Sequence, residues 1–130
     1  MEDIGKLNAI ASRIINYGVD NVDLSMLNPE KKSSLLTDIA ILLFKKGRIE
    51  EAVKTLVVSE NKIILKKWFD DFVEERKSKY AALCAVALKD NINIEKWAVI
   101  CLEDGNYETA LLAFNALGKK DMVDFIKANF

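Results

Sequence analysis

The sequence predicts an all-α protein. Apolar residues recur three and four positions apart along most of the chain, and glycine follows several of these apolar runs, as it follows many helix C-termini. The alternation of apolar and polar residues that is typical of strands is missing. The chain has 130 residues, of which 51% are hydrophobic and only one is proline. We therefore expect one folded domain, residues 1–130.

The first third of the chain is expected to contain a helix, a connector and a helical hairpin. A helix starts at Ile4 and ends before Gly18, and residues 19–27 form a connector with one turn of helix. The next helix starts after Asn28 and Pro29, which suit a cap and a first helical position, and ends at Lys45-Lys46-Gly47. A helix over 49–58 follows so closely that the two must fold back on each other.

The rest of the chain predicts five further helices. The helix over 61–77 is amphipathic, and we expect Trp68, Phe69 and Phe72 to lie in the core. The segment 79–89 is apolar on all sides, which predicts burial at the centre of the domain. Helices over 94–102, 106–118 and 119–130 complete the chain, separated by turns with Asp, Asn or Gly.

Composition excludes most kinds of catalytic site. Histidine is absent, which excludes Ser-His-Asp triads, histidine-ligated metals and histidine pH switches. Cys84 and Cys101 are too few for a structural zinc site, and we expect inert core thiols, a disulfide between them being the alternative. The carboxylates of residues 70, 71, 74 and 75 are expected on a solvated surface. The sequence therefore predicts no enzyme, no metal and no cofactor.

Location is predicted from what the sequence lacks. The N-terminal residues have no signal-peptide pattern, and the longest uncharged apolar run, Tyr80 to Leu88, is far shorter than the roughly 20 residues that span a bilayer. We expect a cytoplasmic protein that does not enter a membrane. The absence of glutamine and the abundance of lysine, glutamate and isoleucine are compatible with a heat-adapted microbe.

Two segments share one residue pattern around a glycine. The pattern consists of three apolar or small residues before the glycine and two after it: Ile39, Ala40, Leu43, Gly47, Ala52 and Leu56, and again Trp97, Ala98, Cys101, Gly105, Ala110 and Phe114. The run Gly105, Tyr107, Ala110 and Phe114 resembles the second half of a tetratricopeptide (TPR) unit. The segment around Gly47 resembles the same unit, with Ile49 in place of the tyrosine.

This resemblance implies about seven or eight helices, stacked as antiparallel hairpins in a right-handed superhelix. Leu36 and Ile94 stand where the family favours tryptophan, and its punctuating proline is absent. Gly47 and Gly105 are 58 residues apart, which is not a multiple of the family's roughly 34-residue period. We therefore expect three hairpins, the middle one of different length. Other irregular α-solenoids, of the coat-protein, armadillo and HEAT types, are similar as well.

The resemblance also implies a scaffold that grips an extended peptide or a partner helix in its concave face. The corresponding positions are on two helices: Ser34, Thr37, Ile41, Phe44 and Lys45, and Ile92, Glu95, Val99, Leu102 and Glu103. The residues at these positions do not support a lysine and asparagine clamp for a terminal carboxylate. The competing interpretation is that the apolar members pack against adjacent helices as core.

Two other functions remain open. A basic patch would bind nucleic acid through Lys45, Lys46, Arg48, Lys62, Lys66 and Lys67. The net charge of −1, from 19 basic and 20 acidic residues, disfavours that function. Alternatively the chain is a homodimeric structural protein that docks onto a copy of itself through Val123, Ile126 and Phe130.

Overall fold

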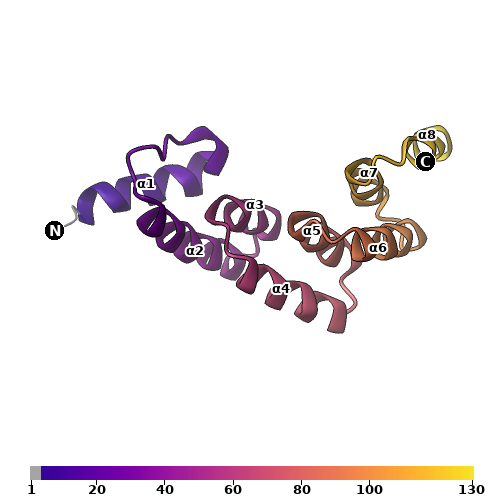
Figure 1. The fold of residues 1–130 in the computed structure, drawn as a ribbon, viewed down its shortest axis with the longest axis horizontal. Coiled ribbons are helices and arrows are strands. Elements are labelled where there is room, and N and C mark those ends of the chain that lie inside the picture. The colour runs from indigo at the N-terminus through magenta and orange to yellow at the C-terminus, as the bar shows by residue number, and fades with distance from the viewer. Residues whose placement is uncertain (1–3) are drawn as a thin grey trace. The chain divides into compact units, whose positions relative to one another are not determined.

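The structure is a computed structural model that describes residues 4–130, with side chains described from Asn8 onward. Over that range it consists of eight α-helices and one 3₁₀ turn without strands, which confirms the all-α prediction (Figure 1). The elements are α1 (Ile4–Tyr17), η1 (Val19–Asn21), α2 (Pro29–Lys45), α3 (Ile49–Ser59), α4 (Lys62–Glu74), α5 (Ser78–Leu88), α6 (Asn91–Glu103), α7 (Tyr107–Ala116) and α8 (Lys120–Asn129). None of these helices is long and apolar enough to cross a membrane.

The chain divides into two compact units. Unit 1 is Met1–Lys62 and unit 2 is Ile63–Phe130, and each is described by itself. The single domain and the right-handed superhelix expected from the sequence stay predictions.

Unit 1 is built on the hairpin of α2 and α3. The Asn28 side chain accepts a hydrogen bond from the Lys31 amide (2.9 Å), which caps α2, and Pro29 takes the first helical position. The side chains that face the partner helix of the hairpin are at most 3% exposed: Leu36, Ile39, Ala40, Leu43, Ala52 and Leu56. Helix α1 packs on α2 and contributes Ile14, which is also buried. An apolar stripe on each helix therefore forms one core.

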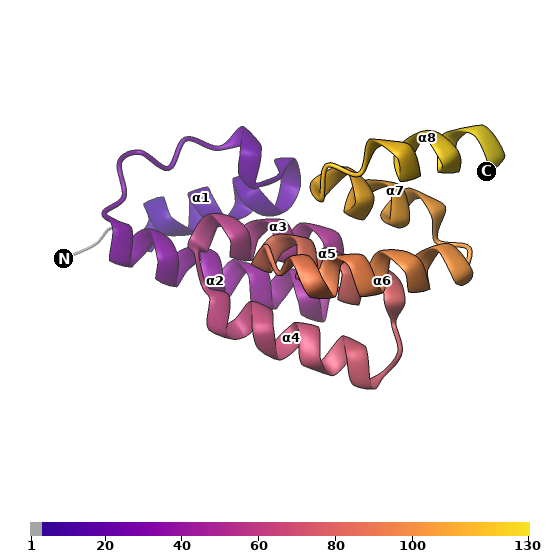
Figure 2. The ribbon, with the colours of Figure 1, turned by 45° about the vertical axis from the view of Figure 1, so that its right-hand side comes forward.

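Unit 2 has a larger and more aromatic core. Trp68, Phe69 and Phe72 of α4 are buried, as predicted, and so are Trp97 of α6 and Phe114 of α7. Helices α5, α6, α7 and α8 follow one another and pack on their neighbours in the chain, α5 also on α7 (Figure 2). The small residues on one side of α5 are fully buried, whereas residues 83, 86, 87 and 88 keep partial exposure. The close approach of α5 therefore uses its small side chains on one broad face.

The backbone repeats every 29 residues. Gly47, Arg76 and Gly105 have the left-handed φ values 81°, 57° and 81°, and each ends the turn after α2, α4 or α6. Three residues with left-handed φ at the same interval, Glu60, Lys89 and Gly118, follow α3, α5 and α7. The turns follow one another at equal intervals, and the first hairpin is the longer one, because α2 has 17 residues whereas α4 and α6 have 13 each. The prediction that the middle hairpin differs in length was therefore wrong. The left-handed Arg76 also explains why α4 ends at Glu74 and not at the expected residue 77.

The hydrogen bonds that close the hairpins repeat with the backbone. The amides of Arg48, Lys77 and Asn106 donate to the carbonyls of Leu43, Phe72 and Cys101 at 3.0, 2.9 and 2.8 Å. These are the bonds that a left-handed residue after a helix makes possible. Each of the same three residues then accepts a bond from the alanine four positions on: Ala52, Ala81 and Ala110. The three hairpins are therefore copies of one local structure.

Candidate partner-binding site

The predicted partner-binding positions of α2 and α6 correspond to each other in the 29-residue repeat. Helices α2, α4 and α6 are the first helices of their hairpins, and we call the outward positions of a first helix the outer row. It consists in α2 of Ser34, Thr37, Ile41, Phe44 and Lys45, in α4 of Ile63, Lys66, Asp70, Val73 and Glu74, and in α6 of Ile92, Glu95, Val99, Leu102 and Glu103. The α2 and α6 positions lie in different units.

Side chains of the outer row are not core. Ile63 is 86% exposed, Ile92 is 83% exposed and Val99 is 42% exposed. In unit 1, Ile41 and Phe44 are half-buried. The buried residues of α6, such as Ile94 and Trp97, lie on a different face of that helix. The outer row therefore offers apolar surface to solvent, which is uncommon for residues as large as isoleucine.

Two hydrogen bonds and one charge interaction link the outer row to residues that immediately precede α4, α6 and α8. The Asn61 Nδ2 donates to Thr37 Oγ1 at 3.2 Å, and Lys119 Nζ donates to Glu95 Oε1, in both cases across 24 residues. At the equivalent place in the middle hairpin, the pKa of Asp90 is lowered by hydrogen bonds from Asn93 and, to a smaller extent, by the charge of Lys66. Thr37 and Glu95, which were predicted to bind a partner, are thus already hydrogen-bonded within their own units.

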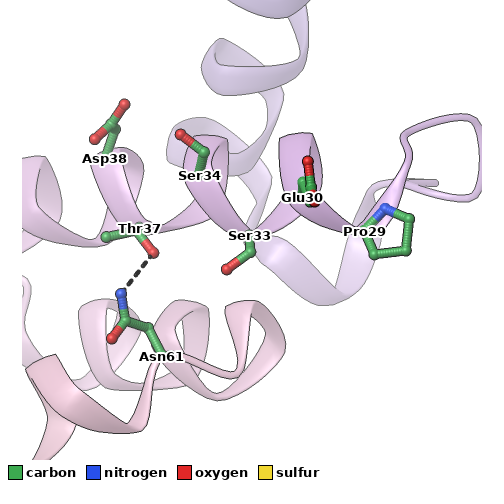
Figure 3. Close-up of a pocket in the computed structure, with 7 residues that line it drawn as sticks. All are labelled: Pro29, Glu30, Ser33, Ser34, Thr37, Asp38 and Asn61. Carbon is green, nitrogen blue, oxygen red and sulfur yellow. Dashed lines mark hydrogen bonds between the residues drawn. The ribbon is translucent and has the colours of Figure 1, made fainter.

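A shallow hollow of about 600 Å³ lies at the N-terminal half of α2 (Figure 3). It is lined by Asn61 and by residues of α2, all of them polar except the proline: Pro29, Glu30, Ser33, Ser34, Thr37 and Asp38. In Figure 3, Thr37 points toward Asn61, whereas Ser34 and Asp38 point away from it. Ser33 Oγ donates to the Ser59 carbonyl at 2.9 Å. Two of its polar side chains, Ser33 and Thr37, are therefore already engaged in hydrogen bonds within unit 1.

The basic patch predicted around residues 45–67 is divided between the two units. Arg48 does not point freely into solvent: its Nη2 donates to the Ile15 carbonyl at 2.5 Å, and its guanidinium forms a forked ion pair with Glu51. That pair raises the pKa of Arg48 and lowers the pKa of Glu51. Lys66 Nζ lies 3.1 Å from Asp70 Oδ1. Among the side chains described from Asn8 onward, Lys45, Lys46, Lys62 and Lys67 are the exposed members of the patch for which the structure gives no ion pair.

Both thiols lie in the interior of unit 2 and are free. Burial raises the pKa of Cys84 to about 12 and that of Cys101 to about 11. Cys101 Sγ donates to the Ser78 carbonyl at 3.3 Å. Because the thiolate is the reactive form, both groups are poor nucleophiles, in line with the prediction of inert thiols. Across the described side chains, no group of three or more His, Cys, Asp or Glu residues could hold a metal ion.

The predicted self-docking surface is used in part inside unit 2. Ile126 is only 3% exposed, so it belongs to the core, and Val123 is half-buried. Phe130 is 59% exposed and stacks on Tyr107, with ring centroids 4.3 Å apart. The ring of Phe125 lies edge-on to the ring of Phe130, with centroids 6.3 Å apart. The exposed apolar surface at the end of unit 2 is therefore the aromatic cluster of Tyr107, Phe125 and Phe130. Of the three predicted self-docking residues, only Phe130 belongs to it.

The outer row of α4 was not predicted from the sequence. Its hairpin has arginine in place of the turn glycine, and Phe69 in place of the alanine of the other two hairpins, so the shared pattern does not include it. The even spacing of the three hairpins is the signal that identifies it. Comparison with known proteins adds no name to this site, since no family model, no curated protein and no solved structure matches the chain.

Proposed function

We propose that the chain is a non-catalytic protein–protein interaction module or scaffold subunit that binds a peptide or a partner helix on the outer row. The observation that carries this proposal is the exposure of large apolar side chains at equal positions of successive first helices, Ile63 and Ile92 above all. Exposed apolar rows with polar borders are typical of protein-binding surfaces.

Other features of the chain agree with this function. A binding module needs a rigid scaffold, and in both units the hairpins are closed by backbone bonds and cores of nearly inaccessible side chains. Free, unreactive thiols suit a reducing compartment, so the proposal includes a cytoplasmic location.

Site-specific photo-crosslinking tests the proposal. A photoreactive amino acid replaces Ile92 or, in a separate variant, Ile63, and the protein is irradiated in lysate of its host. The matched control carries the same group at Leu112 of α7, which is 46% exposed and outside the outer row. We expect one discrete protein adduct from positions 63 and 92 that position 112 does not give. Purified partner should then bind Leu112→Asp normally and Ile92→Asp weakly.

Because Ile92 is largely exposed, Ile92→Asp should keep the circular dichroism spectrum and the melting temperature of the parent protein. Loss of binding without loss of fold therefore assigns the surface. Equal adducts at all three positions, or no adduct at positions 63 and 92, would overturn the proposal.

A further inference from the structure

We propose that the outer row of unit 2 selects a cationic amphipathic helix, that is, a protein segment with lysine or arginine beside a line of apolar residues. This inference rests on the proposed function and names the chemistry of its partner. It concerns α4, α6 and α8 alone, all of which lie in unit 2 except for the first residue of α4.

The charge of this surface is the first argument. The outer rows of α4 and α6 contain the acids Asp70, Glu74, Glu95 and Glu103 against one base, Lys66. Asp121 and Asp124 of α8 occupy the register positions of Ile92 and Glu95. Lys66 pairs with Asp70, and Glu95 pairs with Lys119. These pairs leave the surface with more carboxylates than cations.

The remaining carboxylates are available to a partner. Within residues 8–130, the side chains of Glu74, Glu103, Asp121 and Asp124 form no ion pair or side-chain hydrogen bond, and all four are exposed. Carboxylates without a partner repel one another, and a cation that lies among them relieves this repulsion. An acidic or phosphate-bearing partner would increase it.

The apolar residues supply the second argument. Ile63, Ile92 and Val99 are exposed, and Val73 and Leu102 are half-buried on the same outer rows. On each helix these residues and the acids recur three and four positions apart, so they lie on one stripe. The pair of Glu95 with Lys119 joins the stripe of α6 to the start of α8. A partner helix that complements both the apolar residues and the acids of this surface presents apolar and basic residues at helical spacing.

The equivalent surface of unit 1 differs in charge, which makes the inference specific. The outer row of α2 contains no acid, and Lys45 stands at the register position of Glu74 and Glu103. The repeat therefore gives the same geometry with the opposite charge. A cationic helix is expected to prefer unit 2.

Fluorescence anisotropy with three peptides tests the inference. The probes are amphipathic helical peptides of leucine with lysine, leucine with glutamate, and leucine with glutamine, of equal length and pattern. We expect the leucine–lysine peptide to bind the full chain most tightly. Added salt should weaken this binding, because it screens surface charges, but should not abolish it while the apolar contacts remain.

Charge reversal provides matched variants. In the Glu74→Lys, Glu103→Lys double variant we expect the affinity for the leucine–lysine peptide to fall about tenfold or more, since two attractive pairs become repulsive. The leucine–glutamate peptide should gain affinity for this variant. The control is Asp71→Lys, Glu108→Lys, which changes the net charge equally at two exposed acids outside the outer row. It should bind all three peptides like the parent protein.

The outcomes separate this inference from the proposed function. If the leucine–glutamine peptide binds as tightly as the leucine–lysine peptide, or if the two double variants behave alike, the charge selection is wrong. If no peptide binds although crosslinks at Ile92 persist, the surface binds a partner of other chemistry and only this inference fails. If crosslinks and peptide binding are both absent, the proposed function fails as well.

Discussion

The two units contain the same hairpin and differ in what they add to it. In unit 1 the core of the hairpin is aliphatic, and a guanidinium, that of Arg48, connects the end of α1 to the turn between α2 and α3. Unit 2 has two equivalents of Arg48: Lys77, which forms an ion pair with Glu75 on the surface, and Asn106, whose Nδ2 donates to Ser78 Oγ. Its core is aromatic. The outer row is neutral to basic in unit 1 and acidic in unit 2.

This difference shows which residues the fold needs. The features common to both units are the left-handed residue after each helix, the backbone bonds that it permits, and a small residue where two helices cross. At one core position the side chain changes from isoleucine, Ile39, to tryptophan, Trp68 and Trp97, without altering the length of the repeat. The outer row does not pack in the core, so its side chains can differ in charge between the units without altering the hairpin.

The largest expected effect on stability comes from truncating one large core side chain in each unit. Phe114 of unit 2 and Leu56 of unit 1 occupy the same position of the repeat, and both are at most 2% exposed. We expect Phe114→Ala to cost about 3–5 kcal/mol and Leu56→Ala about 2–5 kcal/mol in the unit that carries it. Trp68 and Trp97 both lie in unit 2, so tryptophan fluorescence reports its unfolding, whereas far-UV circular dichroism reports both units.

Two unit-specific results support the division into units. Phe114→Ala should shift the fluorescence transition, and Leu56→Ala should leave it in place while an early step appears in circular dichroism. Labelling of the two cysteines, which are buried in unit 2, should follow the fluorescence. If Leu56→Ala moves the fluorescence transition as far as the circular dichroism, the chain unfolds as the single domain expected from its sequence.

Most of the fold could be predicted from the sequence because helix ends are local. Asn28 with Pro29, and Gly47 or Gly105 after an apolar stripe, mark boundaries that need no tertiary information. The 29-residue period was missed because Arg76 has no sequence signal for a left-handed residue. Arginine rarely adopts that conformation, and it does so here because the closing bond of the hairpin requires it.

The candidate site could be predicted only in part. The resemblance to TPR units gave positions on α2 and α6, but not the pairs of Thr37 with Asn61 and of Glu95 with Lys119. Such pairs depend on how one hairpin follows the next, which no local pattern encodes. The same holds for Arg48, whose role depends on where the Ile15 carbonyl lies.

A smaller effect is expected from exchanging the turn residues of the two units. A Cβ at Gly47 would meet no atom within 4 Å, so Gly47→Arg should cost only the left-handed backbone, about 1 kcal/mol, in unit 1. Arg76→Gly should stabilise unit 2 by less, because glycine also gains freedom in the unfolded chain. Urea unfolding, followed by circular dichroism and tryptophan fluorescence, measures both. If Gly47→Arg lowers the free energy of unfolding and Arg76→Gly raises it, the two turns have the same backbone structure. A loss of stability in Arg76→Gly would contradict this.

The smallest effect is a difference in how the units respond to acid. The hydrogen bond from Arg48 lowers the pKa of Glu51 in the folded chain. The stability that this pair contributes is therefore present above the pKa of an unfolded glutamate, and it is lost as the pH falls through the lowered folded value. The protection of α1 amides against hydrogen exchange, corrected for the intrinsic exchange rate at each pH, should fall over that acidic range.

The acid response can be assigned by one substitution in each unit. In unit 2 the Asp90 cap of α6 is also expected to lose stability as the pH falls, since hydrogen bonds from Asn93 lower the pKa of Asp90. We expect Glu51→Gln to remove the acid-induced exchange of α1 only, and Asp90→Asn to remove that of the first turn of α6 only. Asp23 also has a lowered pKa in unit 1, from its bonds with Ser25, and Asp23→Asn should leave α1 unchanged. If Glu51→Gln leaves the acid response of α1 intact, Arg48 holds α1 through the Ile15 carbonyl alone, and the ion pair is not what distinguishes unit 1.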